Sequence, residues 1–506
     1  MNILSAIQNI ALNNDDSIAF QNGDATLSYG DLWKQSESLA AYLTTLNLPK
    51  KAPIIVYGHM APMMVSSFLG VVKSGHPYIP VDVSIPKERI QNIIKCSGAA
   101  FLIETENLER DSLQQSSIPY MSEGQLANIV AEHANGSSTS TWVKENDNFY
   151  IIYTSGSTGN PKGVQISAQN LESFVSWMHE DFPITEGKVF LNQAPFSFDL
   201  SVMDLYPALT TGATLFAITK EMIANPKILF GQLAQSKTNV WTSTPSFVQM
   251  CLMNPEFTSE MLPSLNTFLF CGEVLPTEVA KKLLKLFPNA RIFNTYGPTE
   301  ATVAVSAIEV TKELLNDHIS LPIGYIKCDT QMLIIDEDDQ IVPDGEKGEM
   351  IIVGPSVSKG YLGEETLTEK AFFEYKGQQA YRTGDVGYQK KGLHFYSGRA
   401  DFQVKVHGYR MEIEEIENHL LQCQYVDSCV VVPVYKNEAI DFLAAYIVPK
   451  EHSFEKEYQL SSVIKKELAK GLPAYMIPRK FNYCDQLPMT SNGKINRKQI
   501  IAEVMV

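Results

Sequence analysis

The stretch 153-YTSGSTGNPKG-163 combines glycines, hydroxyl side chains and one lysine in a single short loop. A Walker phosphate loop has the pattern G-x-x-x-x-G-K-[ST], in which the lysine directly follows a glycine. Here Asn160 and Pro161 separate Gly159 from Lys162, so the stretch does not match that pattern. Glycine backbone N–H groups, hydroxyl donors and a lysine charge can still bind phosphate oxygens. Two interpretations remain open at this point, a phosphate-binding loop of another kind and a mobile polar surface loop.

The segments on either side of this loop predict two strands. Residues 149–153 form an aromatic and β-branched run that is typical of a buried strand. Residues 164–166 alternate like a second short strand, and apolar residues at helical spacing begin only near Ser167. We therefore expect the loop to join strand to strand, whereas a Walker loop joins strand to helix.

The composition of the whole chain limits the class of protein. A length of 506 residues with 44% hydrophobic residues predicts a large core and at least two domains. The 57 acidic and 41 basic residues give a net charge of −16, which argues against nucleic acid or an anionic membrane as the main partner. No apolar run approaches bilayer length and the N-terminal residues lack a signal-type pattern, so we expect a cytoplasmic protein without membrane insertion. The seven cysteines are scattered, which predicts reduced thiols without a C-x-x-C site.

The pattern of expected elements changes along the chain. Up to about residue 330, helical-period segments alternate with short apolar strands, which favours layered α/β subdomains with mostly parallel sheets. Between about 330 and 398, short strands separated by turn-rich pieces indicate antiparallel hairpins and a small β subdomain. The remaining residues have the pattern of a compact α+β domain. We predict an α/β fold with a large N-terminal domain, residues 1–398, and a small C-terminal domain, residues 399–506.

Further segments contain the residue types needed to activate a carboxylate with ATP. They are 72-VKSGHPYIPVD-82, 294-NTYGPTEAT-302, 381-YRTGDVG-387, 398-GRADFQVKVHGYRMEIEEIE-417 and 489-MTSNGKINRK-498. Together with the opening loop, and in this order, they resemble the motifs of the acyl-adenylate-forming superfamily, which includes acyl-CoA synthetases, firefly luciferase and the adenylation domains of peptide synthetases. The resemblance covers essentially the whole chain. It implies an AMP-forming ligase that uses ATP and Mg²⁺, with a mobile C-terminal domain that rotates about a hinge near Asp401 between two half-reactions.

The resemblance also implies a nucleotide site. Tyr296 would stack on adenine, Asp385 would accept hydrogen bonds from both ribose hydroxyls, and Arg399 would bind ribose or phosphate oxygens. Glu300 would be a ligand of Mg²⁺. Lys494 would be the catalytic residue, because a fixed positive charge offsets the charge that builds on the reacting phosphorus. The predicted ATP-binding residues are Thr154, Ser155, Gly156, Ser157, Thr158, Gly159, Lys162, Asn294, Thr295, Tyr296, Gly297, Pro298, Thr299, Asp385, Tyr396, Ser397, Gly398, Arg399 and Lys494.

Ordinary structural roles remain open for several of these residues. A tyrosine at a turn is often part of the core, and an aspartate in a turn often binds its own backbone. An arginine on a strand is often part of a surface salt bridge, and a lysine in a turn is usually solvated.

One stretch bears on the acid that is activated. Asp199 lies in 196-FSFDLSVMD-204, the F-D-x-S context in which peptide-synthetase adenylation domains pair an aspartate with the substrate's α-ammonium group. Its ordinary alternative is a helix cap. Cys271 and Val303 are expected to line a small cavity that suits a methyl side chain. The resemblance implies that D-alanine is the substrate, with its carboxylate contacted by Lys494.

The resemblance further implies an acceptor. The product would be a thioester on the phosphopantetheine arm of a carrier protein, which supplies the alanylation of lipoteichoic and teichoic acids in Gram-positive bacteria. The chain ends shortly after Lys494, so we expect this carrier to be a separate protein.

Two alternatives remain open. A stand-alone adenylating enzyme for another small amino acid, such as L-alanine or glycine, would carry the same motifs. A non-catalytic nucleotide-binding sensor would keep the same fold, although the presence of Lys494 and the complete opening loop argues against it.

Overall fold

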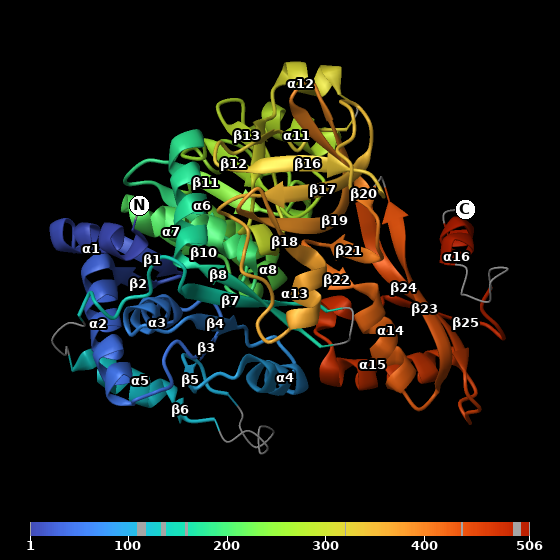
Figure 1. Cartoon of the computed structure of the whole chain (residues 1–506), viewed down its shortest axis with the longest axis horizontal. Helices are drawn as coiled ribbons and strands as arrows, with labels where there is room; N and C mark the ends of the chain where they lie inside the picture. The colour runs from blue at the N-terminus through green and yellow to red at the C-terminus, as the bar shows by residue number, and fades with distance from the viewer. Residues whose placement is uncertain are drawn as a thin grey trace. The chain divides into compact units, whose positions relative to one another are not determined.

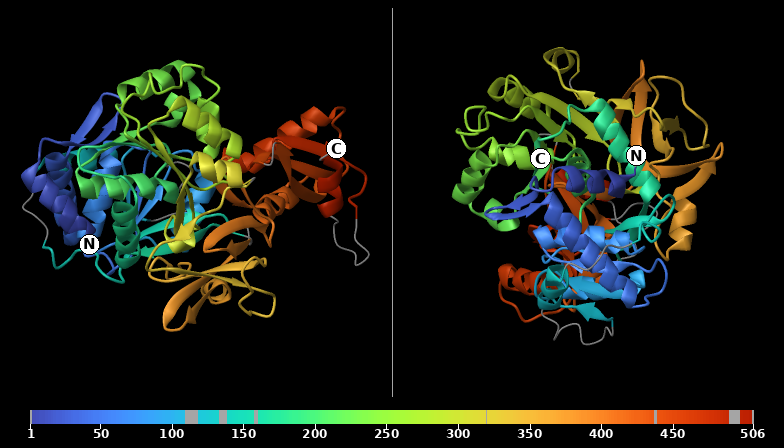
Figure 2. Two further views of the ribbon diagram at one scale, coloured as in Figure 1. Left: turned by 90° about the horizontal axis from the view of Figure 1, so that it is seen from above. Right: turned by 90° about the vertical axis from the view of Figure 1, so that its left-hand side faces the viewer.

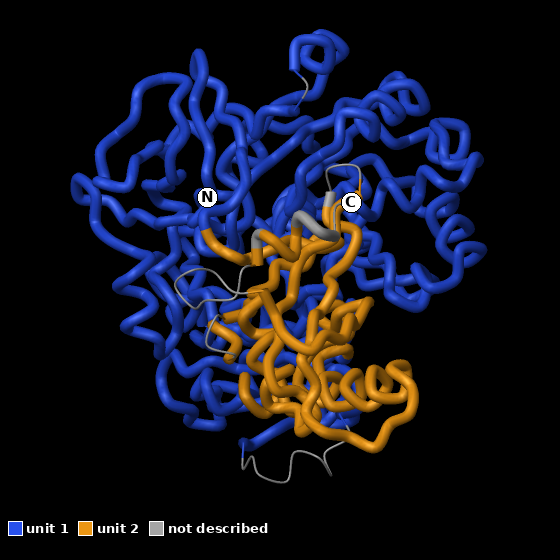
Figure 3. Tube along the Cα trace, turned by 90° about the vertical axis from the view of Figure 1, so that its right-hand side faces the viewer, with its two compact units in different colours: residues 1–83, 94–153, 163–400 blue, residues 84–93, 154–162, 401–506 orange. Residues whose placement is uncertain are grey.

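The computed structural model describes residues 2–108, 118–132, 138–156, 160–318, 320–436, 439–488 and 497–504. The chain forms two compact units (Figure 3). Unit 1 comprises residues 1–83, 94–153 and 163–400, and unit 2 comprises residues 84–93, 154–162 and 401–506. Unit 2 therefore includes most of the predicted C-terminal domain together with the opening loop. The predicted domain limits, residues 1–398 and 399–506, remain predictions.

Unit 1 contains a mostly parallel sheet of six strands in the order β6-β5-β3-β4-β7-β8. The strands are β3 (Ile54–Tyr57), β4 (Tyr78–Val81), β5 (Phe101–Glu104), β6 (Tyr120–Met121), β7 (Asn148–Thr154) and β8 (Lys162–Ser167). Every residue of β3, β4 and β5 is buried, as expected for strands with both faces covered. The helices of this part are α2 (Tyr29–Thr45), α3 (Pro62–Lys73) and α5 (Glu123–Ala131), whereas residues 87–93 of α4 (Lys87–Ser97) belong to unit 2 (Figure 1).

A second sheet has nine strands in the order β15-β14-β13-β12-β11-β9-β10-β1-β2. The strands are β1 (Ile18–Asn22), β2 (Ala25–Ser28), β9 (Val189–Asn192), β10 (Thr214–Ala217), β11 (Val240–Ser243), β12 (Thr267–Phe270), β13 (Arg291–Tyr296), β14 (Ser306–Glu309) and β15 (Tyr325–Ile326). The central strands pair in parallel, and only the edge pairs that include β2, β14 and β15 are antiparallel.

The helices that accompany this sheet are α1 (Ile3–Asn13), α6 (Ala168–Asp181), α7 (Val202–Thr211), α8 (Lys220–Ala224), α9 (Pro226–Gln235), α10 (Pro245–Cys251), α11 (Thr277–Leu286) and α12 (Lys312–Asp317). Two short 3₁₀ helices, η2 (Asp199–Ser201) and η3 (Thr299–Ala301), follow β9 and β13 along the chain.

The segment after β15 forms a separate antiparallel sheet of five strands. It contains β16 (Gln331–Ile335), β17 (Gly348–Val353), β18 (Phe372–Tyr375), β19 (Gln378–Lys390) and β20 (Leu393–Arg399), with helix α13 (Glu365–Ala371) between β17 and β18. Figure 2 shows these strands, coloured yellow to orange, gathered in one layer. The structure thus contains the antiparallel hairpins expected between about 330 and 398, and the predicted α/β fold class is confirmed.

Unit 2 contains the hairpin of β21 (Gln403–Val406) and β22 (Tyr409–Glu412), followed by α14 (Ile413–Gln422). A three-stranded sheet follows, made of β23 (Val426–Lys436), β24 (Ala439–Pro449) and β25 (Lys480–Tyr483). Ile416 and Leu420 of α14 pack in one core with Leu460, Ile464 and Leu468 of α15 (Glu457–Gly471). The remaining elements are η4 (Ala474–Met476) and α16 (Arg497–Val504).

The surroundings of the opening loop agree with the sequence analysis. Strand β7 ends at Thr154 and β8 begins at Lys162, so the loop joins strand to strand. Helix α6 begins at Ala168 after Ser167, whose hydroxyl accepts a hydrogen bond from the Asn170 N–H and caps the helix. Among the helices that the structure describes, none has the length and hydropathy of a membrane span.

A buried lysine in unit 1 makes the stability of this unit depend on pH. Lys73 of α3 is fully buried, lies 2.8 Å from Glu37 Oε1, donates to Ser36 Oγ at 2.7 Å and covers the Trp33 ring at 3.0 Å. Burial lowers the pKa of Lys73 to about 7, and the nearby Glu37 carboxylate opposes that shift only in part. Above that pH, up to the ordinary lysine value of 10.5, the unfolded chain binds a proton that the folded chain does not. The Lys73 contribution to stability therefore rises with pH in this window.

We predict that substituting Lys73→Met removes this dependence. The unfolding free energy of the unchanged chain, minus that of the variant, should grow by about 1.4 kcal/mol per pH unit between about pH 8 and pH 10. Urea unfolding followed by tryptophan fluorescence measures both chains. Lys281→Met is the matched control, because Lys281 is half exposed in its pair with Glu278. A difference that stays flat with pH would contradict the prediction.

Candidate active site

Three residues predicted to bind the nucleotide converge in unit 1. Tyr296 is the last residue of β13 and its hydroxyl donates to Asp385 Oδ2 at 2.5 Å. Asp385 lies in β19, where its other carboxylate oxygen accepts from Arg399 NH1 at 2.6 Å. Asp385 and Arg399 face each other in the β19–β20 register. The structure therefore brings together residues that lie far apart in the sequence.

The electrostatics of this cluster fix the direction of its hydrogen bonds. Burial raises the pKa of Tyr296 well above its ordinary value, and the adjacent Asp385 carboxylate raises it further. The phenol thus stays protonated and donates to Asp385. A carboxylate has about four acceptor positions. With one donor on each oxygen, Asp385 keeps acceptor positions for further donors such as two ribose hydroxyls.

Three other predicted residues at or just after the end of β13 contact the protein itself. Asn294 Nδ2 donates to Pro322 O at 2.8 Å and Thr295 Oγ1 donates to Phe270 O at 2.9 Å, so both side chains hold neighbouring backbone. A Cβ on Gly297 would lie 2.5 Å from Ala304 Cα, which explains why only glycine fits there.

Pro298 is the residue immediately before η3. On β20, the ring of Tyr396 lies 6.4 Å from the ring of Tyr296, Ser397 is exposed, and Gly398 has a φ of 120°.

The described part of the opening loop already binds an anionic group within unit 2. The Gly156 N–H donates to Glu415 Oε2 at 3.2 Å, and the Glu415 carboxylate is also paired with Arg89. Ser155 Oγ donates to Arg410 O and accepts from the Glu412 N–H, both at 3.1 Å. A backbone N–H of this loop is therefore able to hold a carboxylate, which is the behaviour expected of an anion-binding loop.

Other residues of the loop add to this description. Lys162 Nζ lies 3.9 Å from Glu412 Oε1. Thr154 Oγ1 is buried and has no hydrogen-bond partner among the described residues. Ser157, Thr158 and Gly159 lie outside the described residues, as does Lys494.

Asp199 is connected to the segment that follows β13. It opens η2, and its Oδ2 accepts a hydrogen bond from Thr299 Oγ1 at 2.6 Å. The cap position of η2 belongs to Phe198, so the alternative role of Asp199 as a helix cap does not apply. Thr299 was predicted to bind ATP, and this contact to Asp199 was not expected from the sequence.

The next residue, Glu300, is completely buried and accepts a hydrogen bond from Tyr361 OH at 2.8 Å. No group of three or more histidine, cysteine, aspartate or glutamate side chains suited to a metal ion occurs in the part of the chain that the structure describes. Mg²⁺ that accompanies a nucleotide usually has one or two carboxylate ligands, with phosphates and water completing its shell. A single carboxylate at Glu300 therefore fits such an ion.

Cys271 and Val303 lie against each other. Cys271 follows β12, and its Sγ is 3.8 Å from Val303 O. Both side chains are buried. Thr302 and Val303 have φ angles of 59° and 69°, a backbone conformation that costs a β-branched residue about 1–3 kcal/mol. Sequence patterns gave no sign of this strained pair, which sets the position of the Val303 side chain and carbonyl.

The predicted hinge residue, Asp401, is the first residue of the 401–506 segment of unit 2, and its Oδ1 accepts from the Gln403 N–H at 3.1 Å.

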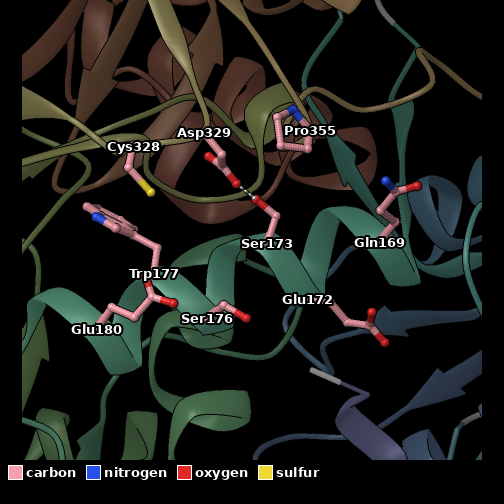
Figure 4. A pocket seen from close by; sticks show the side chains of 9 residues that line it. All are labelled: Gln169, Glu172, Ser173, Ser176, Trp177, Glu180, Cys328, Asp329 and Pro355. Carbon is pink, nitrogen blue, oxygen red and sulfur yellow. Dashed lines mark hydrogen bonds between the residues drawn. The ribbon is translucent and has the colours of Figure 1, made fainter.

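A different pocket of about 280 Å³ lies beside α6 (Figure 4). Trp177, Glu172 and Asp329 are among the residues that line it, and Ser173 Oγ donates to Asp329 Oδ2 at 2.7 Å. None of the predicted site residues lines this pocket, so it is separate from the candidate active site.

Comparisons with known proteins show the family of the chain. Residues 7–362 match the family AMP-binding enzyme, and residues 415–494 match the AMP-binding enzyme C-terminal domain. Similar relatives are named D-alanine–D-alanyl carrier protein ligase. The protein from Bacillus licheniformis is 58% identical and the one from Bacillus velezensis is 57% identical, each with 100% of both chains covered.

A similar solved structure is the Vibrio cholerae adenylation domain AlmE in complex with glycyl-adenosine-5'-phosphate. Its TM-score is 0.81 at 23% identity, and the match covers 99% of this chain and 97% of the other. At this identity the likeness concerns the fold. The family predicted from the sequence is confirmed by the family match and by the full-length relatives. The chain therefore belongs to the AMP-binding enzyme family and is an AMP-forming ligase.

Proposed function

We propose that this chain activates D-alanine with ATP and then passes the D-alanyl group to a phosphopantetheine thiol on a separate carrier protein. The observation that carries the proposal is the full-length identity of 58% to a relative named D-alanine–D-alanyl carrier protein ligase. In the first half-reaction, a carboxylate oxygen attacks the α-phosphorus and pyrophosphate leaves. In the second, the thiol attacks the acyl carbon and AMP leaves.

Asp199 is the proposed partner of the substrate's α-ammonium group. Its carboxylate accepts a hydrogen bond from the Thr299 hydroxyl at 2.6 Å, and a carboxylate has about four acceptor positions, so it can also accept hydrogen bonds from an ammonium group. Cys271 and Val303, which are buried side by side, would close the space around the side chain. A methyl group fits such a wall better than a larger substituent does.

For the nucleotide, we propose that Tyr296 contacts adenine, that Asp385 accepts the ribose hydroxyls and that Arg399 adds a positive charge beside them. The opening loop would hold the phosphates that leave as pyrophosphate. Glu300 is the proposed ligand of Mg²⁺, an ion that supplies charge neutralisation on the phosphates when it is bound. Lys494 is the proposed catalytic residue, and its ammonium group would offset charge on the α-phosphate.

We further propose that the chain acts in the cytoplasm and that its product serves the alanylation of lipoteichoic or teichoic acids. The Bacillus relatives support a Gram-positive setting. A second candidate function is activation of another small amino acid, because the solved structure AlmE binds a glycyl-adenylate.

The substrate is tested by ATP–pyrophosphate exchange with D-alanine, L-alanine and glycine at equal concentrations. We expect exchange to be fastest with D-alanine, by a factor of about 10 or more, because each 1.4 kcal/mol of difference between the two bound transition states changes the rate tenfold. Equal or faster exchange with L-alanine would contradict D-alanine as the substrate. Absence of exchange with every amino acid would instead favour a non-catalytic nucleotide-binding sensor.

We predict that Lys494→Ala lowers the exchange rate by a factor of about 100–1,000, since removing one group that stabilises transition-state charge has an effect of this size. The binding of ATP, measured by calorimetry, should change far less. Lys466→Ala is the control, because this lysine is exposed on α15. Exchange that survives Lys494→Ala at the normal rate would exclude Lys494 from the chemistry.

We also predict that Asp385→Asn raises the KM for ATP by a factor of about 10–100, since breaking hydrogen bonds to a charged group costs about 1.5–3 kcal/mol. The variant removes the charge that Arg399 NH1 contacts at 2.6 Å and turns one acceptor into a donor. The KM for D-alanine should stay within about threefold. Asp338→Asn, at an exposed turn, is the control. An unchanged KM for ATP would remove Asp385 from the nucleotide site.

A further inference from the structure

Two buried polar side chains connect the ends of the segment that carries Asp199. Asn192 is the last residue of β9 and Asp204 lies in the first turn of α7, and both have 0% exposure. Asn192 Nδ2 donates to Asp204 Oδ2 at 3.2 Å and to Ala194 O at 3.1 Å. The strand before Asp199 and the helix after it are therefore joined across twelve residues of sequence.

The chain between these two points is held by further hydrogen bonds. The Phe198 N–H donates to Pro195 O at 2.9 Å, and Ser201 Oγ donates to Phe198 O at 2.7 Å. Asp199 then reaches Thr299 Oγ1 at 2.6 Å. A segment fixed at both ends and folded on itself has little conformational freedom to lose when a ligand binds.

The pair between Asn192 and Asp204 is costly for the core. Among the described residues, Asn192 Oδ1 is buried without a hydrogen-bond partner, and Asp204 Oδ1 and Thr242 Oγ1 are buried near each other without a hydrogen bond of good geometry. Burial raises the pKa of Asp204 well above its ordinary value, and the nearby Thr242 hydroxyl and Asn192 amide, which both lower it, oppose this only in part. Apolar residues of similar volume would fill such a place at a lower cost in free energy. A role in stability alone therefore does not account for an aspartate at this position.

We infer that Asn192 and Asp204 are positioning residues for the amino-acid substrate, because their contact fixes the 193–199 segment and with it the carboxylate that meets the α-ammonium group. This inference rests on the proposed function, in which Asp199 binds that ammonium group. The inference predicts that the pair affects the binding of the amino acid and leaves the binding of ATP unchanged. Tyr296, Asp385 and Arg399, which are proposed to bind the nucleotide, lie on β13, β19 and β20. Asn192 and Asp204 belong to none of these strands.

The inference is tested with full-length variants in the ATP–pyrophosphate exchange assay. Asp204→Ala should raise the KM for D-alanine by a factor of 10 or more, while the KM for ATP stays within twofold. Asp204→Asn should restore the KM for D-alanine to within about threefold, because asparagine keeps the shape and polar contacts of the neutral acid. Asn192→Ala is the second variant, and it should behave like Asp204→Ala. Thr210→Val on the same helix is the control, since its hydroxyl contacts Tyr206 O at 2.6 Å and His179 Nε2 at 3.1 Å, and neither partner belongs to the 193–199 segment.

Asp199→Asn separates the two levels of the inference. If this variant leaves the KM for D-alanine unchanged, the proposed role of Asp199 fails. If it raises that KM while Asp204→Ala and Asn192→Ala do not, the positioning role is overturned and the role of Asp199 stands. Thermal melts accompany each assay. A parallel rise of both KM values with a lowered Tm, not restored by Asp204→Asn, would also overturn the inference, because it would show a role in stability alone.

Discussion

The Asp385 carboxylate, held from two sides, is the interaction on which the candidate active site depends. Tyr296 binds it from the end of a strand in the nine-stranded sheet, and Arg399 binds it from the five-stranded antiparallel sheet. A carboxylate with a donor on each oxygen cannot turn freely, so its remaining acceptor positions point in fixed directions. The same contact joins the α/β part of unit 1 to its β subdomain. A nucleotide bound there would therefore contact a surface that exists before it arrives.

The parallel strands of the nine-stranded sheet explain why the other groups gather near this point. Asp199 follows β9, Cys271 follows β12, and Tyr296 ends β13. Carboxyl ends of neighbouring parallel strands lie on the same edge of a sheet, which is where ligands bind in open α/β folds. The hydrogen bond between Thr299 and Asp199 then connects the segment after β13 with the segment after β9. In the proposed reaction, this contact couples the place of the amino acid to the place of the phosphates.

Local sequence patterns predicted much of the fold. They did not predict which residues far apart in the sequence contact each other. The helix that begins after Ser167 and the strand-to-strand loop follow from periodicity, and both are confirmed. The motifs predicted the family, which is also confirmed. By contrast, the hydrogen bond between Tyr361 and Glu300, and the one between Thr299 and Asp199, join residues 61 and 100 positions apart. Periodicity indicates on which face of a helix or strand a side chain lies, but it does not indicate which residue that side chain contacts. The roles of the predicted site residues stay predictions.

The central claim is that a carboxylate attacks the α-phosphorus, and the position of a transferred oxygen atom tests it directly. D-alanine labelled with ¹⁸O in its carboxylate is incubated with ATP, Mg²⁺, the full-length chain and an acceptor thiol, and the phosphorus products are analysed by mass spectrometry. Adenylyl transfer predicts one ¹⁸O atom in AMP and none in inorganic phosphate, because the bridging oxygen stays on phosphorus when the thiol attacks the acyl carbon. Label in inorganic phosphate, with ADP as the other product, would show γ-phosphoryl transfer and would contradict the account.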